Sequence, residues 1–239
     1  MNIKKGVFCS FVFISLPKIT AIKQQKRNPS RYSVYLDGHF VVGLSGITAA
    51  RWKLKVGQEL SGEEVSNLVR AGRKDKLLEV ALSFLEYRPR SEKEIADYLK
   101  KRTFKRDYGF SSPEEKEVVL REVIDRLREL RLVDDRAFGR WWIDQRQKAR
   151  KPKGRWFIRS ELKRKGLALE VIDELLDSLK EGREEEAAWQ LAQKKYSLLL
   201  GRGQKNAFTL RQKIKRYLVG RGFGYEVVQK VVERLANEE

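Results

Sequence analysis

The chain has 239 residues, of which 52 are Lys or Arg and 33 are Asp or Glu, so its formal net charge is +19. This charge predicts a polyanionic partner: nucleic acid is the commonest, and an anionic membrane surface or an acidic protein groove are alternatives. Cys9 is the only cysteine and His39 the only histidine, which excludes an internal disulfide and disfavours His-based triads and Cys/His zinc sites. We therefore expect a cytoplasmic protein without a cofactor or bound metal, although a Mg²⁺ site made only of carboxylates stays open.

The chain begins with a short apolar stretch, "VFCSFVFISL", which follows two lysines and loosely resembles a signal peptide. The stretch is too short to span a bilayer, which takes about 20 residues. Pro17 and Lys18 follow it in place of a small-residue cleavage site. We interpret residues 1–17 as an added leader or the product of an upstream start codon, and we expect no membrane contact.

Residues 18–72 are predicted to form a small β-hairpin module with helices. Three stretches have the alternation of strands: "KITAIKQQ", "RYSVYLDG" and "HFVVGLS". Asp37-Gly38 is a strong hairpin-turn signal, because both residues tolerate a positive φ. A sheet this small buries little core by itself, so helices within 47–71 are expected to cover it.

The helices of this module are expected to break at Gly57. Ser61 and Glu64 have the spacing of a capping box, in which each side chain accepts a hydrogen bond from the other residue's backbone. A helix is therefore predicted to begin just after Ser61.

The rest of the chain has helical periodicity and repeats itself. "IRSELKRKGLALEVIDELLDSL" (158–179) aligns with "IKRYLVGRGFGYEVVQKVVERL" (214–235) at one shift of 56 residues, and a diverged copy lies at 95–102 and 123–132. Each copy follows an apolar helix. The prediction is a mainly α protein with three tandem three-helix bundles, at 73–133, 134–181 and 182–239, in an elongated array. Gly166 and Gly222 are expected to end the middle helices in the left-handed conformation.

The charge separates by helix. Residues 138–166 contain 11 basic residues and two acids, 202–221 contain seven basic residues and no acids, and 170–186 contain eight acids. Arg155, Arg159 and Lys163 lie four apart, on a face away from the core positions, where they could follow the phosphates of a nucleic acid. The alternative is a solvated basic face that balances acids elsewhere.

The predicted contacts to DNA or to a filament are basic residues of the two middle helices and their loops, together with one tryptophan. They are Arg146, Lys148, Arg150, Lys151, Lys153, Arg155, Trp156, Arg159, Lys163, Arg164, Lys165, Lys205, Arg211, Lys213, Lys215 and Arg216.

The aromatic residues divide into two groups. Phe138, Trp142 and Trp189 have the spacing of core positions on the first helices of their units. Trp156 and Phe157 are adjacent and surrounded by basic residues, so both cannot easily face inward. One of them is expected either to stack on a nucleotide base or simply to repack.

Two motifs resemble active-site elements but have simpler interpretations. Asp134 and Asp135 fall where one helix pattern ends and the next begins, so capping is favoured over a paired-carboxylate nuclease site. "GRGQKN" (201–206) has no preceding strand and lacks the Lys-Ser/Thr ending of a P-loop, so a plain loop is predicted.

The middle unit resembles the signature of the bacterial RecX regulators. The resemblance rests on "LVDDRAFGRWWIDQR", a following Gly154 and "IRSELKRKGL". The matching positions are Asp134, Asp135, Phe138, Arg146, Gly154, Ile158, Glu161, Leu162, Lys165 and Gly166. "ITAIKQQKRNPSRYSVYLDGHF" also resembles the β-hairpin module of longer members. Trp156 and Phe157 depart from the pattern, since relatives often have basic or other residues there.

The resemblance implies a non-enzymatic modulator of the RecA recombinase. Members of this family consist of three tandem three-helix repeats that lie in the groove of the RecA–DNA filament and inhibit recombinase and coprotease activity. The implied partners are the RecA filament and single-stranded DNA, with double-stranded DNA as a further candidate, and the protein is expected to be a monomer. The alternatives are a general DNA-binding or architectural protein with helix-turn-helix-like units and an Mg²⁺-dependent nuclease.

Overall fold

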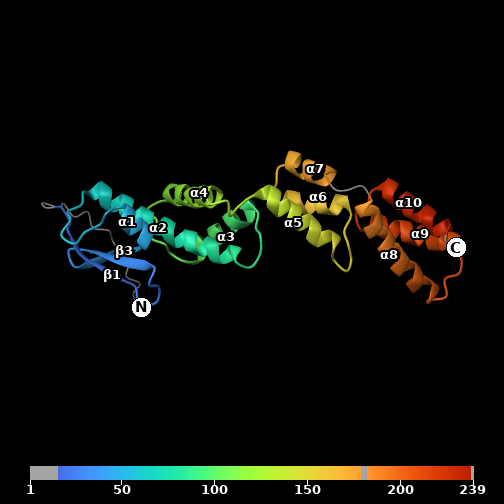
Figure 1. The fold of residues 1–239 in the computed structure, drawn as a ribbon, viewed down its shortest axis with the longest axis horizontal. Helices are drawn as coiled ribbons and strands as arrows, with labels where there is room; N and C mark the ends of the chain where they lie inside the picture. Colours follow the sequence, from blue (N-terminus) through green and yellow to red (C-terminus); the bar gives the residue numbers. More distant parts are fainter. Residues whose placement is uncertain (1–15, 179–181, 238–239) are drawn as a thin grey trace. The chain divides into compact units, whose positions relative to one another are not determined.

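The computed structural model describes residues 16–178 and 182–237, so most of the predicted leader lies outside the described residues. The described chain is mainly helical and starts with a small sheet (Figure 1). It divides into two compact units, one with residues up to 83 and 102–125, the other with 84–101 and 126 onwards. The predicted class, a mainly α protein of three-helix repeats after a β-hairpin module, is confirmed.

The sheet has three antiparallel strands in the order β1-β2-β3. They are β1 (Ile19–Gln24), β2 (Arg31–Leu36) and β3 (His39–Ser45). Asp37 and Gly38 have φ angles of 48° and 83°, which confirms the predicted hairpin turn with two positive φ values. Alternate residues such as Val34 and Leu44 are fully buried in the module's core.

Two helices follow the sheet, α1 (Gly46–Arg51) and α2 (Gly62–Leu85). The capping box at the start of α2 is confirmed: the Ser61 N–H donates to Glu64 Oε2 at 2.7 Å, and the Glu64 N–H donates to Ser61 Oγ at 3.2 Å. The boundary predicted between residues 72 and 73 falls inside α2, which runs through both residues without a break. Gly72 packs closely on β3, because a Cβ there would lie 2.1 Å from Val42 Cγ2.

The first repeat continues with α3 (Glu92–Lys105) and α4 (Pro113–Glu129). The loop between them, which the sequence comparison marks as an insertion, is fastened to α2. Arg73 forms an ion pair with Glu115 and donates to the Gly109 carbonyl. The insertion is therefore an ordered part of its unit.

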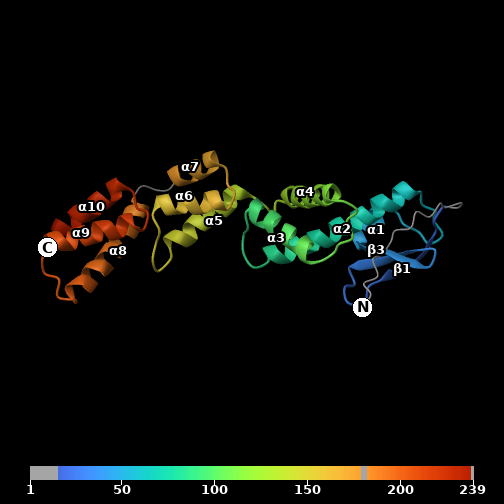
Figure 2. The same ribbon diagram turned by 180° about the vertical axis from the view of Figure 1, so that it is seen from behind.

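The second and third repeats are three-helix bundles (Figures 1 and 2). Their helices are α5 (Asp135–Gln147), α6 (Arg155–Arg164), α7 (Leu169–Asp177), α8 (Arg183–Leu200), α9 (Ala207–Val219) and α10 (Tyr225–Asn237). Phe138 and Trp189 are buried in the two cores, and Trp142 packs against the first of them, as predicted. Gly166 and Gly222 have φ angles of 91° and 85° at the ends of the middle helices, which confirms their predicted conformation.

Candidate functional site

The predicted basic row of α6 faces acidic residues of α7. Arg155 forms an ion pair with Asp177, and Arg159 Nη1 lies 2.6 Å from Asp173 Oδ1. Lys163, the third member of the row, is exposed. The charge of the row is therefore partly balanced within the repeat, as the alternative interpretation of this face anticipated for two of its three members.

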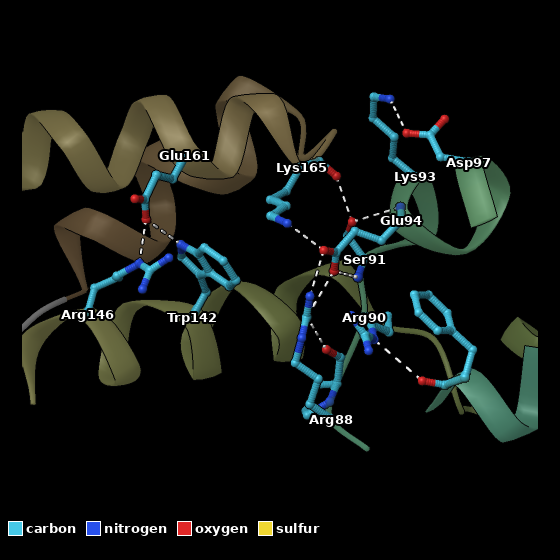
Figure 3. Close-up of polar contacts among 12 residues, drawn as sticks. Arg88, Arg90, Ser91, Lys93, Glu94, Asp97, Trp142, Arg146, Glu161 and Lys165 are labelled. Atoms are coloured by element: carbon cyan, nitrogen blue, oxygen red, sulfur yellow. Dashed lines mark hydrogen bonds and ion pairs between the residues drawn. The ribbon is translucent and has the colours of Figure 1, made fainter. Parts of the chain in front are cut away.

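Glu161 gathers two further predicted contact residues, Arg146 and Lys153, and Figure 3 shows its contacts with Arg146 and Trp142. Its side chain is only 8% exposed and accepts from Arg146 Nε at 2.6 Å, from Trp142 Nε1 at 2.9 Å and from Lys153 Nζ. Burial alone would raise the pKa of Glu161, but the hydrogen bonds from Lys153, Arg146 and Trp142 lower it. Arg146 and Lys153 consequently hold the α5–α6 loop in place.

A second carboxylate, Glu94 on α3, holds Lys165 from the end of α6 (Figure 3). Arg88 Nη2 lies 2.8 Å from Glu94 Oε1, and Arg88 Nη1 donates to Oε2 at 3.0 Å. Burial opposes ionisation of Glu94, but hydrogen bonds from Arg88 and Lys165 and their positive charges lower its pKa from 4.5 to about 2. Lys165 is therefore part of the joint between the first and second repeats.

Asp134 and Asp135 both act as helix caps. Asp134 Oδ1 accepts from the backbone N–H groups of Arg136 at 2.8 Å and Ala137 at 3.0 Å, which confirms the predicted start of α5. Asp135 accepts from the Glu92 N–H at 2.9 Å and so caps α3 of the preceding repeat. Burial raises the pKa of Asp135. Within residues 16–178 and 182–237, no group of three or more His, Cys, Asp or Glu side chains could hold a metal ion.

Consecutive repeats meet at a joint that recurs. The loop after α6 contacts the start of α3, where Ser91 Oγ donates to the Lys165 carbonyl at 2.7 Å. The loop after α9 contacts the start of α6 in the same way: the Gly154 N–H donates to the Arg221 carbonyl at 3.0 Å. In both cases the end of one middle helix covers the beginning of the middle helix before it.

The middle helix of the third repeat lies in a segment of the sequence without acids. Residues 187–225 contain nine basic residues and no Asp or Glu. At the shift of 56 residues, the acid Asp173 is replaced by Gln229 and Glu174 by Lys230, whereas Glu226 and Glu233 on α10 keep the acids of Glu170 and Asp177. Lys213 donates to Gln204 Oε1 at 3.1 Å, a neutral partner. The charge on α9 is therefore not balanced by acids of its own segment.

The remaining predicted contacts are mostly exposed. Lys215 lies 4.9 Å above the Tyr225 ring, Lys148 pairs with Asp144 at 2.9 Å, and Arg211 is half-buried. The other exposed ones are Arg150, Lys151, Arg164, Lys205 and Arg216. The structure thus gathers basic residues on two surfaces, the α5–α6 loop of the second repeat and α9 with its preceding loop.

Trp156 and Phe157 separate as the sequence required. Phe157 is half-buried and packs against Gly222, whereas the Trp156 side chain is 66% exposed. Trp156 is thus the member of the pair that remains available to a ligand.

No described helix has both the length and the apolar composition to cross a membrane. Family models match four segments of the chain. They are the regulatory protein RecX N-terminal domain at residues 17–61 and the first, second and third three-helix domains of RecX at 78–108, 134–176 and 183–232.

Curated relatives carry the same family name over most of their length. The chain is 31% identical over 183 residues to the regulatory protein RecX of Clostridium tetani, covering 77% of this chain and 78% of that protein. It is 30% identical over 184 residues to the regulatory protein RecX of Clostridium beijerinckii, covering 77% of this chain and 80% of that protein.

Two crystal structures share the fold. One, of a regulatory protein RecX, covers 91% of this chain and all of its own, with a TM-score of 0.71 and 27% identity. RecX from Lactobacillus salivarius covers 69% of this chain and 97% of its own, with a TM-score of 0.58 and 22% identity.

Proposed function

Because this chain belongs to the RecX family of regulatory proteins, we propose that it is a non-enzymatic, cytoplasmic regulator that binds the RecA–DNA filament and inhibits RecA recombinase and coprotease activity. The observation that carries the DNA part of the proposal is the acid-free segment 187–225 with its nine basic residues. A surface of this kind binds phosphates with little dependence on sequence.

The two basic surfaces have different roles in the proposal. On α9, Lys215 occupies the position of Arg159, and Gln229 stands in place of Asp173, the carboxylate that pairs with Arg159. Lys213 and Arg216 lie beside Lys215 in the same acid-free segment. Cations that already pair with carboxylates gain less from a phosphate, because the existing ion pair must be given up. The third repeat is therefore proposed to supply most of the phosphate contacts.

Several weak contacts in one chain suit a filament. A filament presents the same groove again along its axis, and linked repeats that each bind weakly gain avidity when they engage together. The protein is proposed to act as a monomer in this way, with single-stranded DNA and RecA protomers as its partners.

The test of the proposal is the ATPase activity of RecA on single-stranded DNA, titrated with the purified protein. We expect the rate to fall when the protein is well below the amount needed to coat the DNA. An unrelated ATPase that requires single-stranded DNA serves as the control and should fall only at coating amounts. Equal inhibition of the two enzymes would instead indicate a general DNA-binding or architectural protein, which the acid-free segment also suits.

Charge-reversal variants of the two middle helices test the division between them. Reversal of Lys213, Lys215 and Arg216 to Glu should abolish most DNA binding, because three phosphate contacts are lost and repulsion is added. The matched triple reversal of Arg155, Arg159 and Lys163 should have a smaller effect on affinity. Equal losses for the two variants would contradict the dominant role of α9.

A further inference from the structure

Trp156 is the exposed member of the five tryptophans, since Trp52, Trp141 and Trp142 are half-buried and Trp189 is buried. Trp156 is 66% exposed, whereas Trp189 is 4% and Phe138 is 1% exposed. Nothing in the packing of α6 requires an indole at this place, since Ile158 and Leu162 already fill the core. We propose that Trp156 is a stacking platform for a base of single-stranded nucleic acid, an inference that rests on the proposed function and specifies the form of DNA that this surface takes.

The joint between the second and third repeats fixes the backbone that carries the indole. The backbone N–H of Trp156 donates to the Gly222 carbonyl at 3.1 Å. The neighbouring Phe157 ring meets the indole edge-on, with centroids 5.1 Å apart and planes at 73°. Phe157 itself packs directly on Gly222, where an added Cβ would lie 2.4 Å from Phe157 Cδ2. An indole on a fixed backbone with the Phe157 ring against its edge loses less conformational entropy when a base stacks on it than a side chain without such a contact.

The same joint also holds the basic loop between α5 and α6. Arg221 Nη2 donates to the carbonyls of Lys151 and Pro152, the latter at 3.0 Å, while the next residue, Gly222, accepts from Trp156. The loop that carries exposed Lys148, Arg150 and Lys151 is thereby fastened to Arg221, and the tryptophan backbone to the adjacent Gly222. The phosphates that flank a stacked base are assigned to this loop.

The acids near this site are already engaged with Arg155. Asp177 pairs with the Arg155 guanidinium, and Glu184 Oε1 accepts from the Arg155 backbone N–H at 2.8 Å. Both therefore lie at the Arg155 side of the helix start. On this basis the phosphates are assigned to the α5–α6 loop and not to the face of α6 toward α7.

The chemistry of stacking selects single strands. In a duplex the faces of the bases are covered by their neighbours, so an exposed indole finds no free π surface except at an end. In a single strand every base offers a face, and stacking on an aromatic side chain strengthens binding by about tenfold per base with little dependence on sequence. The site is thus expected to bind single-stranded DNA more tightly than duplex DNA, with little dependence on the base sequence.

The test is a double-mutant cycle in which the side chain at position 156 and the bases of the DNA are changed singly and together. The affinities of wild type, Trp156→Ala and Trp156→Phe are measured by fluorescence anisotropy for a labelled thymidine oligonucleotide, for an abasic oligonucleotide of equal length, and for a duplex. Trp156→Ala should weaken binding to the thymidine strand about tenfold, while its binding to the abasic strand and to the duplex stays at the wild-type level. Trp156→Phe should recover most of the loss.

Phe104→Ala, which removes another aromatic side chain that is 89% exposed, is the matched control and should bind all three DNAs like wild type. Thermal unfolding of each variant checks that the fold is kept. Equal affinities of wild type and Trp156→Ala for the thymidine strand, or equal losses on the thymidine and abasic strands, would overturn the stacking platform. Strong salt-dependent binding in the same assay would still support the proposed phosphate contacts, so the two ideas fail separately.

Discussion

The Glu94 carboxylate at the first joint gives a prediction with a calculable size. Its pKa falls from 4.5 to about 2 in the folded protein, because Arg88 and Lys165 stabilise the charge against the cost of burial. At about 1.4 kcal/mol for each tenfold change in the proton equilibrium, this corresponds to about 3 kcal/mol of folding free energy at pH 7. A lowered pKa stabilises the fold above pH 4.5, and the contribution disappears as the pH falls from 4.5 toward 2.

The perturbation is Glu94→Gln, which keeps the shape of the side chain and removes its titration. Denaturant unfolding of wild type and variant is followed at pH 7 and pH 3. The difference in free energy of unfolding between wild type and variant should be about 2 kcal/mol smaller at pH 3 than at pH 7. At pH 3 only about 1 kcal/mol of the Glu94 contribution remains. Any repulsion between Arg88 and Lys165 in the variant is the same at both pH values and cancels from this difference.

A matched control is available on the same helix. Asp97 pairs with Lys93 one turn away and is 61% exposed, so Asp97→Asn should cost less than about 0.5 kcal/mol at pH 7. If wild type and Glu94→Gln differ in free energy of unfolding by the same amount at pH 7 and pH 3, Arg88 and Lys165 do not hold the carboxylate ionised. The description of this joint would then be wrong.

The remaining predictions concern α7 and the second joint. Asp173→Asn should release Arg159, tighten binding to single-stranded DNA and steepen its salt dependence by about 0.7 in the log–log slope; Glu170→Gln removes the same charge from the same helix, and an equal gain there would show only a long-range effect. Gly222→Ala should destabilise the protein by about 3 kcal/mol in a thermal or denaturant melt, from its φ of 85° and the contact with Phe157. Gly203→Ala, with φ of 81° and open space around it, should cost only the backbone strain of a positive φ, about 1 kcal/mol of unfolding free energy. Equal losses of stability in the two variants would show that the contact with Phe157 contributes nothing.

The helices and their cores could be predicted because their signals are local. The hairpin turn at Asp37-Gly38, the cap at Asp134 and the left-handed glycines depend on a few neighbouring residues, and the structure contains them as predicted. The packing of Gly72 on Val42, in the middle of α2, could not be predicted, since it depends on residues that lie 30 positions apart in the sequence.

The candidate site was harder to predict because charge says little about pairing. The sequence shows where the basic residues are, but the partners of Lys165 and Arg155 lie 71 and 22 residues away in the sequence. Ser91 and Glu94 carry the spacing of a capping box, which indicates a helix start and gives no sign that Glu94 also binds Lys165. The tertiary structure decides which cations remain for a ligand.

The recurring joint also bears on how the chain folds as it is synthesised. Gly154, at the start of α6, offers no side chain to cap its helix, and its backbone N–H and that of Trp156 bond to carbonyls of residues 221 and 222. Those residues emerge from the ribosome more than 60 residues later. The first turn of α6 therefore lacks these two protein partners until the end of α9 is made, and in a chain that stops before residue 221 the two N–H groups would bond to water instead.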